Sequence, residues 1–280
     1  MLSGLFGIGG GFLMTPALIF MGISPAVAVA SSANQIIASS FSGFLAHAKR
    51  HNVDYKMGFV MIFGGLIGSF FGISLFSFFR KLGQIDLVIS LCYIFILGTI
   101  GLSMAIESFR TIANLRSPKT TNNDSKTFLQ KLPFKIYFPR SKITISILVP
   151  IFASIFAGIL VSFMGIGGGF IMIPVMIYLI GMPTSVVIGT SLFQIIFVTC
   201  NVTFLHAINS YSVDIVLVFI LLITSVIGAQ YGTRLGVKIP AEKLRFLLAV
   251  LILAVVGKLL SSFFITPENI YQIIPFSYMQ

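Results

Sequence analysis

The strongest constraint in this sequence is the length of its stretches without a charged residue. No Lys, Arg, Asp or Glu occurs before Lys49, and none occurs between Lys142 and Asp214, a run of 71 residues. A helix needs about 20 apolar residues to cross a bilayer, so this run alone is long enough for at least two crossings. The chain is therefore predicted to be a multi-pass membrane protein, and a water-soluble fold is excluded.

The charges that do occur are mostly basic and are concentrated in one polar segment. Of the residues, 57% are hydrophobic and only 9% are charged, against roughly a quarter in a typical soluble domain, and the formal net charge is +11. Basic clusters beside membrane spans are typical of the cytoplasmic side, so we expect a cell (inner) membrane protein whose central loop is cytoplasmic, with no nucleic acid partner. The cluster comprises Arg110, Arg116, Lys119, Lys126, Lys131, Lys135, Arg140 and Lys142.

Breaks in the apolar runs, marked by Pro, Gly and charged residues, predict about eight transmembrane helices. The predicted spans are 2–21, 26–47, 57–79, 86–107, 143–164, 184–206, 214–235 and 245–265. Residues 108–142 form the only long polar connection between them, so they divide the chain into two halves.

The two halves carry the same motif, GIGGGF, at residues 7–12 and 165–170. The match continues, with one residue inserted near position 180, through Pro16 with Pro174, Gly22 with Gly181, Gln35 with Gln194, His47 with His206 and Asp54 with Asp214. Such self-similarity predicts a duplicated unit. We expect an all-α fold of two tandem repeats of about four helices, broken at the GIGGG motifs: a first repeat over 1–107, a linker over 108–142, a second repeat over 143–266 and a tail over 267–280.

The first repeat is shorter at its start than the second. A full apolar span precedes the second motif, whereas only residues 1–6 precede the first. We expect a truncated or misassigned start, the alternative being a lost first helix. Four crossings per half would make the repeats parallel and an odd number would invert them, and the span count favours the parallel relation without deciding it.

The glycines of the motifs are candidates for a site made of backbone amides. A continuous helix over 143–180 would be about 57 Å long, nearly twice the roughly 30 Å hydrocarbon core, so it must break where glycines make a helix least stable. A helix that resumes after the break points free amides and its positive dipole end toward the gap, which favours an anion. The alternative is that the glycines serve only close helix packing. The predicted substrate contacts are Gly9, Gly10, Gly11, Gly167, Gly168 and Gly169.

The next helix of each half supplies polar partners for such an anion. Spacings of four and eleven residues place each set on one helical face, and Asn34 lies beside the first set. Uncharged amides and hydroxyls can bind an oxyanion and release it easily, although interhelical hydrogen bonding is an equally good interpretation of these residues. The sets are Ser31, Gln35 and Ser42 in the first half and Thr190, Gln194 and Asn201 in the second.

His47 and His206 occupy matching helix ends and are candidates for a proton relay. The more conservative interpretation is that each caps carbonyl groups or meets lipid headgroups. Asp54 and Asp214 precede the third helix of each half and are predicted to be helix N-terminal residues.

The duplicated GIGGGF with Pro16 and Pro174, the turn over residues 22–25, and the Ser/Thr-Ser plus Gln pattern at 31–35 and 190–194 resemble the sulfite exporter TauE/SafE family of membrane permeases. The resemblance covers nearly the whole chain apart from the linker and the tail. It implies a transporter with about eight helices in two repeats that handles sulfite, sulfonates and other small sulfur-containing or organic anions.

We therefore expect a permease that exports a small anion by alternating access between its repeats, with the lipid bilayer as its other partner. No cofactor, metal or catalytic residue is predicted, because the chain has three histidines and neither an HExxH pattern nor paired acids inside a span. The rival interpretations are a non-transporting scaffold or inactive truncated relative and, more remotely, an intramembrane enzyme. The residues do not determine the substrate, the coupling ion or the oligomeric state.

Overall fold

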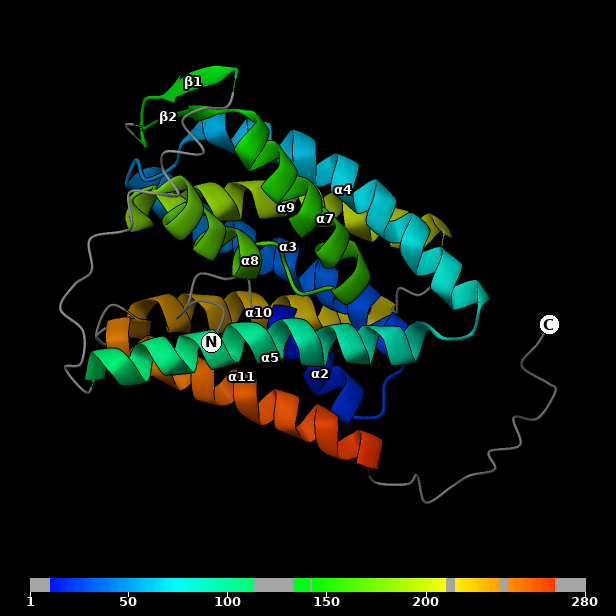
Figure 1. Cartoon of the computed structure of the whole chain (residues 1–280). Helices are drawn as coiled ribbons and strands as arrows, with labels where there is room; N and C mark the ends of the chain where they lie inside the picture. The colour runs from blue at the N-terminus through cyan, green and yellow to red at the C-terminus, as the bar shows by residue number, and fades with distance from the viewer. Residues whose placement is uncertain (1–10, 113–132, 142, 210–214, 237–240, 265–280) are drawn as a thin grey trace, which may run out of the picture.

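The computed structural model describes residues 11–112, 133–141, 143–209, 215–236 and 241–264, which form a helical bundle with one short hairpin (Figure 1). The first half contributes α2 (Gly11–Phe20), α3 (Pro25–Lys49), α4 (Tyr55–Lys81) and α5 (Ile85–Ile112). The hairpin consists of β1 (Lys135–Phe138) and β2 (Ile143–Ser146). The second half contributes α7 (Leu148–Met164), α8 (Gly169–Pro174), the π-helical turn η1 (Val175–Ile180), α9 (Thr184–Asn209), α10 (Ile215–Gly236) and α11 (Ala241–Phe264).

Residues 143–146, predicted to begin a membrane helix, form strand β2 instead. Ile143 and Ile145 alternate with Thr144 and Ser146 in the two-residue period of a strand, and antiparallel pairing with β1 satisfies the backbone of these residues. Helix α7 begins only at Leu148. The all-α prediction therefore describes the bundle but is wrong for this hairpin.

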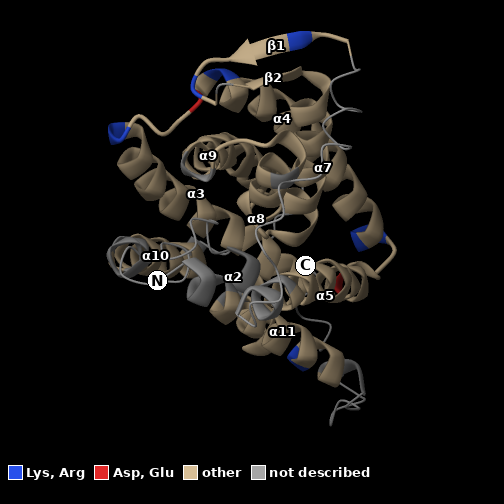
Figure 2. Cartoon of the chain, turned by 60° about the vertical axis from the view of Figure 1, so that its left-hand side comes forward, with Lys and Arg blue, Asp and Glu red and all other residues tan. Residues whose placement is uncertain are grey.

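The bundle has the dimensions and surface of a membrane protein. Three described helical stretches are long and apolar enough to cross a bilayer, namely Tyr55–Lys81, Ile85–Ile106 and Val186–Ile208, and shorter apolar stretches cover Leu148–Met164, Val216–Gly228 and Ala249–Ser261. On α4, Phe59 and Phe70 are 62% and 63% exposed, which suits lipid far better than water. Figure 2 shows the charged residues mainly at helix ends, in loops and on the hairpin.

Helices α4 and α7 pack so closely that glycine is required on both. A Cβ at Gly68 of α4 would lie 2.0 Å from the carbonyl oxygen of Ile155, and one at Gly158 of α7 would lie 2.4 Å from the carbonyl oxygen of Gly65. Small residues at this kind of spacing let membrane helices bring their backbones together. The α4–α7 pair is therefore a tight, backbone-to-backbone contact.

Helices α3 and α9 run antiparallel through the middle of the bundle. Late in α3, a Cβ at Gly43 would lie 3.0 Å from Cδ1 of Leu192, which is early in α9. Early in α3, Ala33 packs with Val202, which is late in α9. The two helices that carry the matched polar residues of the two halves thus lie side by side in opposite directions.

The outer helices are arranged around this central pair. Helix α4 packs on α9 and α10 packs on α3. Helix α5 packs against α11. A Cβ at Gly98 would lie 3.8 Å from Val256 and one at Gly101 would lie 2.7 Å from Ile252, so these two helices are also antiparallel. Helices α3 and α5 of the first half therefore pack against their sequence counterparts in the second half, α9 and α11.

The chain reverses direction between α7 and α8. Met176 and Ile180 of η1 belong to the same apolar cluster as Val149 and Ala153 at the beginning of α7. The end of η1 therefore lies beside the start of α7, and the glycine segment between Met164 and Gly169 is the turning point, in the interior of the bundle.

Candidate functional site

The glycine segment between α7 and α8 is the centre of the candidate site. Gly165 and Gly167 have φ angles of +64° and +78°, a backbone conformation that residues with a side chain rarely adopt. A Cβ at Gly165 would also lie 2.8 Å from the carbonyl oxygen of Val29, so α3 leaves it no space. All residues from 161 to 170 are buried. The turn can therefore be made only with glycine at these positions.

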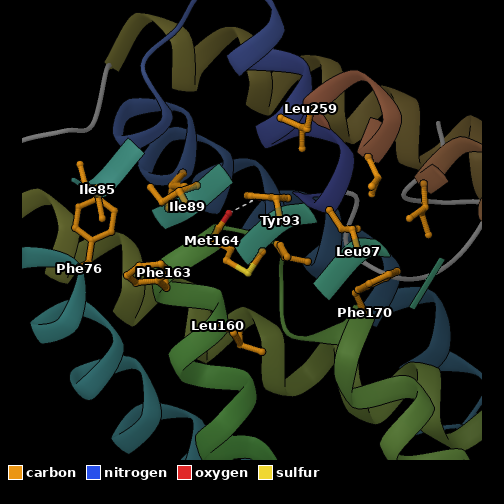
Figure 3. Close-up of a cluster of buried hydrophobic side chains, with 14 residues drawn as sticks. Phe76, Ile85, Ile89, Tyr93, Leu97, Leu160, Phe163, Met164, Phe170 and Leu259 are labelled. Carbon is orange, nitrogen blue, oxygen red and sulfur yellow. Dashed lines mark hydrogen bonds between the residues drawn. The ribbon is translucent and has the colours of Figure 1, made fainter. Parts of the chain in front are cut away.

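Side chains from two other helices bind the carbonyl groups at the end of α7. The hydroxyl of Tyr93, on α5, donates a hydrogen bond to the carbonyl oxygen of Met164, as Figure 3 shows within the surrounding apolar cluster. Nε2 of His206, on α9, lies 2.9 Å from the carbonyl oxygen of Ser162. Because a carbonyl only accepts, Nε2 carries the hydrogen and Nδ1 is the free nitrogen of the ring. The last carbonyl groups of a helix have no hydrogen-bond donors within that helix, and here side chains of other helices supply the donors.

A hydroxyl pair from the first half completes this arrangement. Ser32 Oγ, on α3, lies 3.4 Å from the carbonyl oxygen of Gly165 and 3.0 Å from that of Val29. It is also 2.6 Å from Thr15 Oγ1 of α2. Four helices, α2, α3, α5 and α9, thus contribute side chains to the network that holds the end of α7.

The amide groups of the same segment are left without partners. The amide of Gly165 donates to the carbonyl oxygen of Val161, and the next bonded amide is that of Phe170, which donates to Gly167. Within the described chain, the four amides of residues 166–169 have no hydrogen-bonded acceptor. A segment with occupied carbonyls and free amides is polarised to attract an anion.

The unpartnered polar side chains of the interior are concentrated on two helices. Seven buried side-chain N or O atoms without a hydrogen-bond partner are found among the described residues: Ser31 Oγ, Gln35 Oε1, Ser40 Oγ and His47 Nδ1 on α3, and Gln194 Oε1, Thr203 Oγ1 and His206 Nδ1 on α9. Buried polar groups in native proteins are nearly always hydrogen-bonded, so a concentration of exceptions requires a physical reason. A polar ligand or water bound beside α3 and α9 would supply the missing partners.

The two predicted glutamines are both in this set. Gln194 is 2% exposed and faces α4, where a Cβ at Gly65 would lie 3.3 Å from its Nε2. Gln35 is 9% exposed and follows Ser32 by three residues, so it lies about one helical turn from the contact with the glycine segment. Gln35 therefore lies near the turn, whereas Gln194 lies against α4, twelve residues before His206, the α9 residue that contacts the end of α7.

The other predicted polar residues have different surroundings. Ser31 is fully buried and has no partner, like Gln35 one turn further on. Asn34 is partly exposed, and its Nδ2 donates to the carbonyl oxygen of Ala30 in its own helix, 3.2 Å away. Thr190 Oγ1 accepts a hydrogen bond from the amide of Asp54 at 3.0 Å. Thr190 is therefore tied to the start of α4.

The two candidate relay histidines do not form a pair. His47 lies near the end of α3, and the neighbouring Ala48 packs with Phe193 in the first turns of α9. His206 lies near the other end of α9, fully buried against the ring of Phe76 with the ring centroids 4.7 Å apart. Because α3 and α9 are antiparallel, the two imidazoles are at opposite ends of this helix pair.

Some predicted residues could not be placed, and some contacts could not be predicted. Gly9 and Gly10 lie outside the described residues, and Gly11 is the first residue of α2. The hydrogen bond from Tyr93 to Met164 could not be predicted from the local sequence. A tyrosine in an apolar run is equally typical of a position that faces lipid or packs against another helix. Neither had the 2.7 Å hydrogen bond from Asn201 Nδ2 to Ser69 Oγ, between α9 and α4.

Comparison with known proteins decides the class of this bundle. The family model of the sulfite exporter TauE/SafE matches residues 1–259. The chain belongs to the TauE/SafE family. Similar proteins include the probable membrane transporter YunE of Bacillus subtilis, 27% identical with 84% of this chain and 82% of the relative covered, and YjnA of the same organism, 25% identical with 90% and 92% covered. A probable membrane transporter of Methanocaldococcus jannaschii, MJ0441, is 27% identical with 91% and 89% covered.

No solved structure matches the chain. The family assignment confirms the resemblance carried by the repeated motif, and this TauE/SafE protein is a membrane transporter. The free amides and unpartnered glutamines are therefore features of a permease interior.

Proposed function

We propose that this TauE/SafE protein transports small anions, with sulfite, sulfonates and related sulfur-containing or organic anions as the substrate class. The observation that carries the proposal is the concentration of unpartnered buried polar atoms on α3 and α9, beside a turn with free amides. A side-chain amide can turn so that the unpartnered position presents NH₂, and Gln35 and Gln194 would then both donate to an oxyanion. The contacts at Gly9, Gly10 and Gly11 belong to the same proposal.

The absence of a cation in the site suits transport. The unpartnered groups named above on α3 and α9 are hydroxyls, amides and imidazoles, with no Lys or Arg among them. Neutral donors hold an anion less strongly than a guanidinium or an ammonium group does, so the anion can leave again. A weak site is what a permease needs, since a tightly bound substrate is not released.

The arrangement of the helices supports alternating access. The sequence counterparts α3 and α9 are antiparallel, as are α5 and α11, which supports an inverted relation between the halves instead of the parallel one favoured by the span count. Rocking of one half against the other would then expose the site to each side in turn. With the basic linker in the cytoplasm and a potential negative inside, anion exit is favoured by about 2.3 kcal/mol per charge per 100 mV.

The test is flux of labelled sulfite, a sulfonate and a carboxylate into proteoliposomes under an imposed potential. We expect potential-dependent sulfite flux that falls at least tenfold in the double variant Gln35→Leu, Gln194→Leu. The matched control is Gln84→Leu, an exposed glutamine between α4 and α5 that should leave flux unchanged. Flux no greater than in empty liposomes, from folded protein, would refute the proposal and favour a scaffold. A carboxylate preference would replace the sulfur-containing substrate class.

A further inference from the structure

A buried carboxylate joins the hairpin to the start of α4. Asp54 is 1% exposed, and its Oδ1 accepts a hydrogen bond from the amide of Met57 at 3.2 Å, as expected for a helix N-terminal residue. Its Oδ2 accepts two more, from the amide of Ser141 at 3.1 Å and from Ser141 Oγ at 2.7 Å. The helix-capping role explains the first bond but not the other two, which reach the turn between β1 and β2.

The backbone of the same residue is joined to the helix that carries Gln194. The amide of Asp54 donates to Thr190 Oγ1, and Thr190 precedes Gln194 by one turn of α9, about 6 Å along the helix. The fit is tight, since a Cβ at Gly189 would lie 2.2 Å from the carbonyl oxygen of Asn52. Asp54 therefore links the hairpin to α9 about one helical turn from Gln194.

The hairpin is also attached to the bundle by apolar side chains, including the partly buried Ile136, Ile143 and Ile145. Phe138 is fully buried in an apolar cluster with Met57, Met176 and Val187. The exposed Lys56 Nζ donates to the carbonyl oxygen of Tyr137 at 3.1 Å. A two-stranded hairpin is marginally stable alone, so its position depends on these contacts and on Asp54. Loss of the Asp54 hydrogen bonds would therefore weaken the attachment of the hairpin to α4 and α9.

The matching hydroxyl of the α3 helix has no hydrogen-bond partner among the described residues. Ser31 occupies the position in α3 that Thr190 occupies in α9, yet its hydroxyl is buried without a partner. Asp214, which matches Asp54 in the sequence, lies outside the described residues, so the comparison of the halves ends at these two hydroxyls.

We propose that Asp54 and Ser141 form a latch that closes the anion site on the hairpin side, with Phe138 as its apolar plug and Thr190 as its connection to α9. The inference rests on the proposed transport function and names the element that must open during each cycle. Release requires the two Ser141 hydrogen bonds to break together, so that the hairpin and Phe138 lift from the cluster.

The first test locks the latch covalently. In a chain with Cys92 and Cys200 replaced by Ala, Asp54→Cys and Ser141→Cys place two thiols where oxygen atoms now lie 2.7 Å apart. Oxidation should lower sulfite flux at least tenfold and a reductant should restore it, whereas neither single cysteine should respond. Full flux through the cross-linked pair would overturn the latch but leave transport intact. Absence of flux in the parent chain as well would instead count against the proposed function.

The second test measures opening without transport. Val187→Cys places a thiol in the buried cluster beneath Phe138. Its labelling by a membrane-impermeant maleimide should become several-fold faster with Ser141→Ala. Ser146→Ala is the matched control, since this hydroxyl of the same hairpin donates to Pro133 at 2.7 Å, accepts from the adjacent amide of Leu148 at 3.3 Å and has no bond to Asp54, so the rate should be unchanged. Equal labelling rates in the two variants would overturn the proposal.

Discussion

The α4–α7 and α3–α9 pairs are built on opposite principles. In α4–α7, glycines bring the backbones together, and Ser162 Oγ of α7 donates to the carbonyl oxygens of Ser69 on α4, at 3.1 Å, and of Gly158 in its own helix, at 3.0 Å. In contrast, α3 and α9 carry buried hydroxyl, side-chain amide and imidazole atoms that have no hydrogen-bond partner. The first pair is closely packed and its buried polar groups are hydrogen-bonded, whereas the second pair is packed but carries buried polar atoms without hydrogen bonds.

This difference indicates that the α4–α7 pair serves the stability of the bundle, whereas the α3–α9 pair serves its function. Close helix packing and bonded polar groups stabilise a membrane protein, so α4–α7 is expected to stay together as a rigid unit. Unpartnered buried groups cost stability unless something else binds them, so α3–α9 is the interface at which a ligand or a rearrangement is useful. The variants below compare the two pairs, from the largest expected effect to the smallest.

The largest effect is expected from adding one methyl group to the tight pair. In Gly68→Ala the new Cβ would lie 2.0 Å from the carbonyl oxygen of Ile155. The position of a Cβ is fixed by its own backbone and the carbonyl is part of the other backbone, so the helices must separate. We expect a loss of roughly 3 kcal/mol, measured as a lower melting temperature in detergent. Gly98→Ala is the control, since its Cβ would be 3.8 Å from Val256, an ordinary contact. Equal stability of the two variants would show that α4–α7 is not rigid.

A smaller effect is expected at the end of α7, where a bond from α5 holds the glycine turn. Tyr93→Phe removes only the hydroxyl and leaves the carbonyl oxygen of Met164 buried without that donor. The expected cost is about 1 kcal/mol, in the range measured for hydrogen bonds inside membranes. Tyr137→Phe, at an exposed tyrosine, should be neutral. Anion flux should fall along with stability, because the turn that presents the free amides loses a support.

Helix positions could be predicted because membrane helices have local signatures. The span predicted at 57–79 corresponds to α4 over Tyr55–Lys81, whose ends are marked by Asp54 on one side and Arg80 and Lys81 on the other. The polar set around Gln35 and Gln194 was predictable from its helical spacing and its repetition in the other half. Both predictions need only residues that are near one another in the sequence or repeated within it.

The unpredicted features all depend on contacts between distant residues. Asp54 and Ser141 are 87 positions apart, and Tyr93 and Met164 are 71 apart. Nothing in the local sequence pairs them, so Asp54 was interpreted only as the N-terminal residue of a helix. The strand at 143–146 was missed for a related reason, because Ile-Thr-Ile-Ser is apolar enough to extend the adjacent helix until its pairing with Lys135–Phe138 is known.

The smallest expected effect is also the most informative about the α3–α9 pair. Replacing a polar residue that stabilises the fold with an apolar one lowers the stability of the protein. Replacing a polar residue that serves only to bind substrate does not. Gln35→Leu and Gln194→Leu each remove a buried acceptor without a partner, so stability should stay within about 0.5 kcal/mol or rise slightly. Asn201→Leu breaks the bond to Ser69 Oγ and should cost about 0.6 kcal/mol or more. If thermal unfolding in detergent instead shows larger losses for the glutamine variants than for Asn201→Leu, the glutamines hold the helices together and the difference between the two pairs disappears.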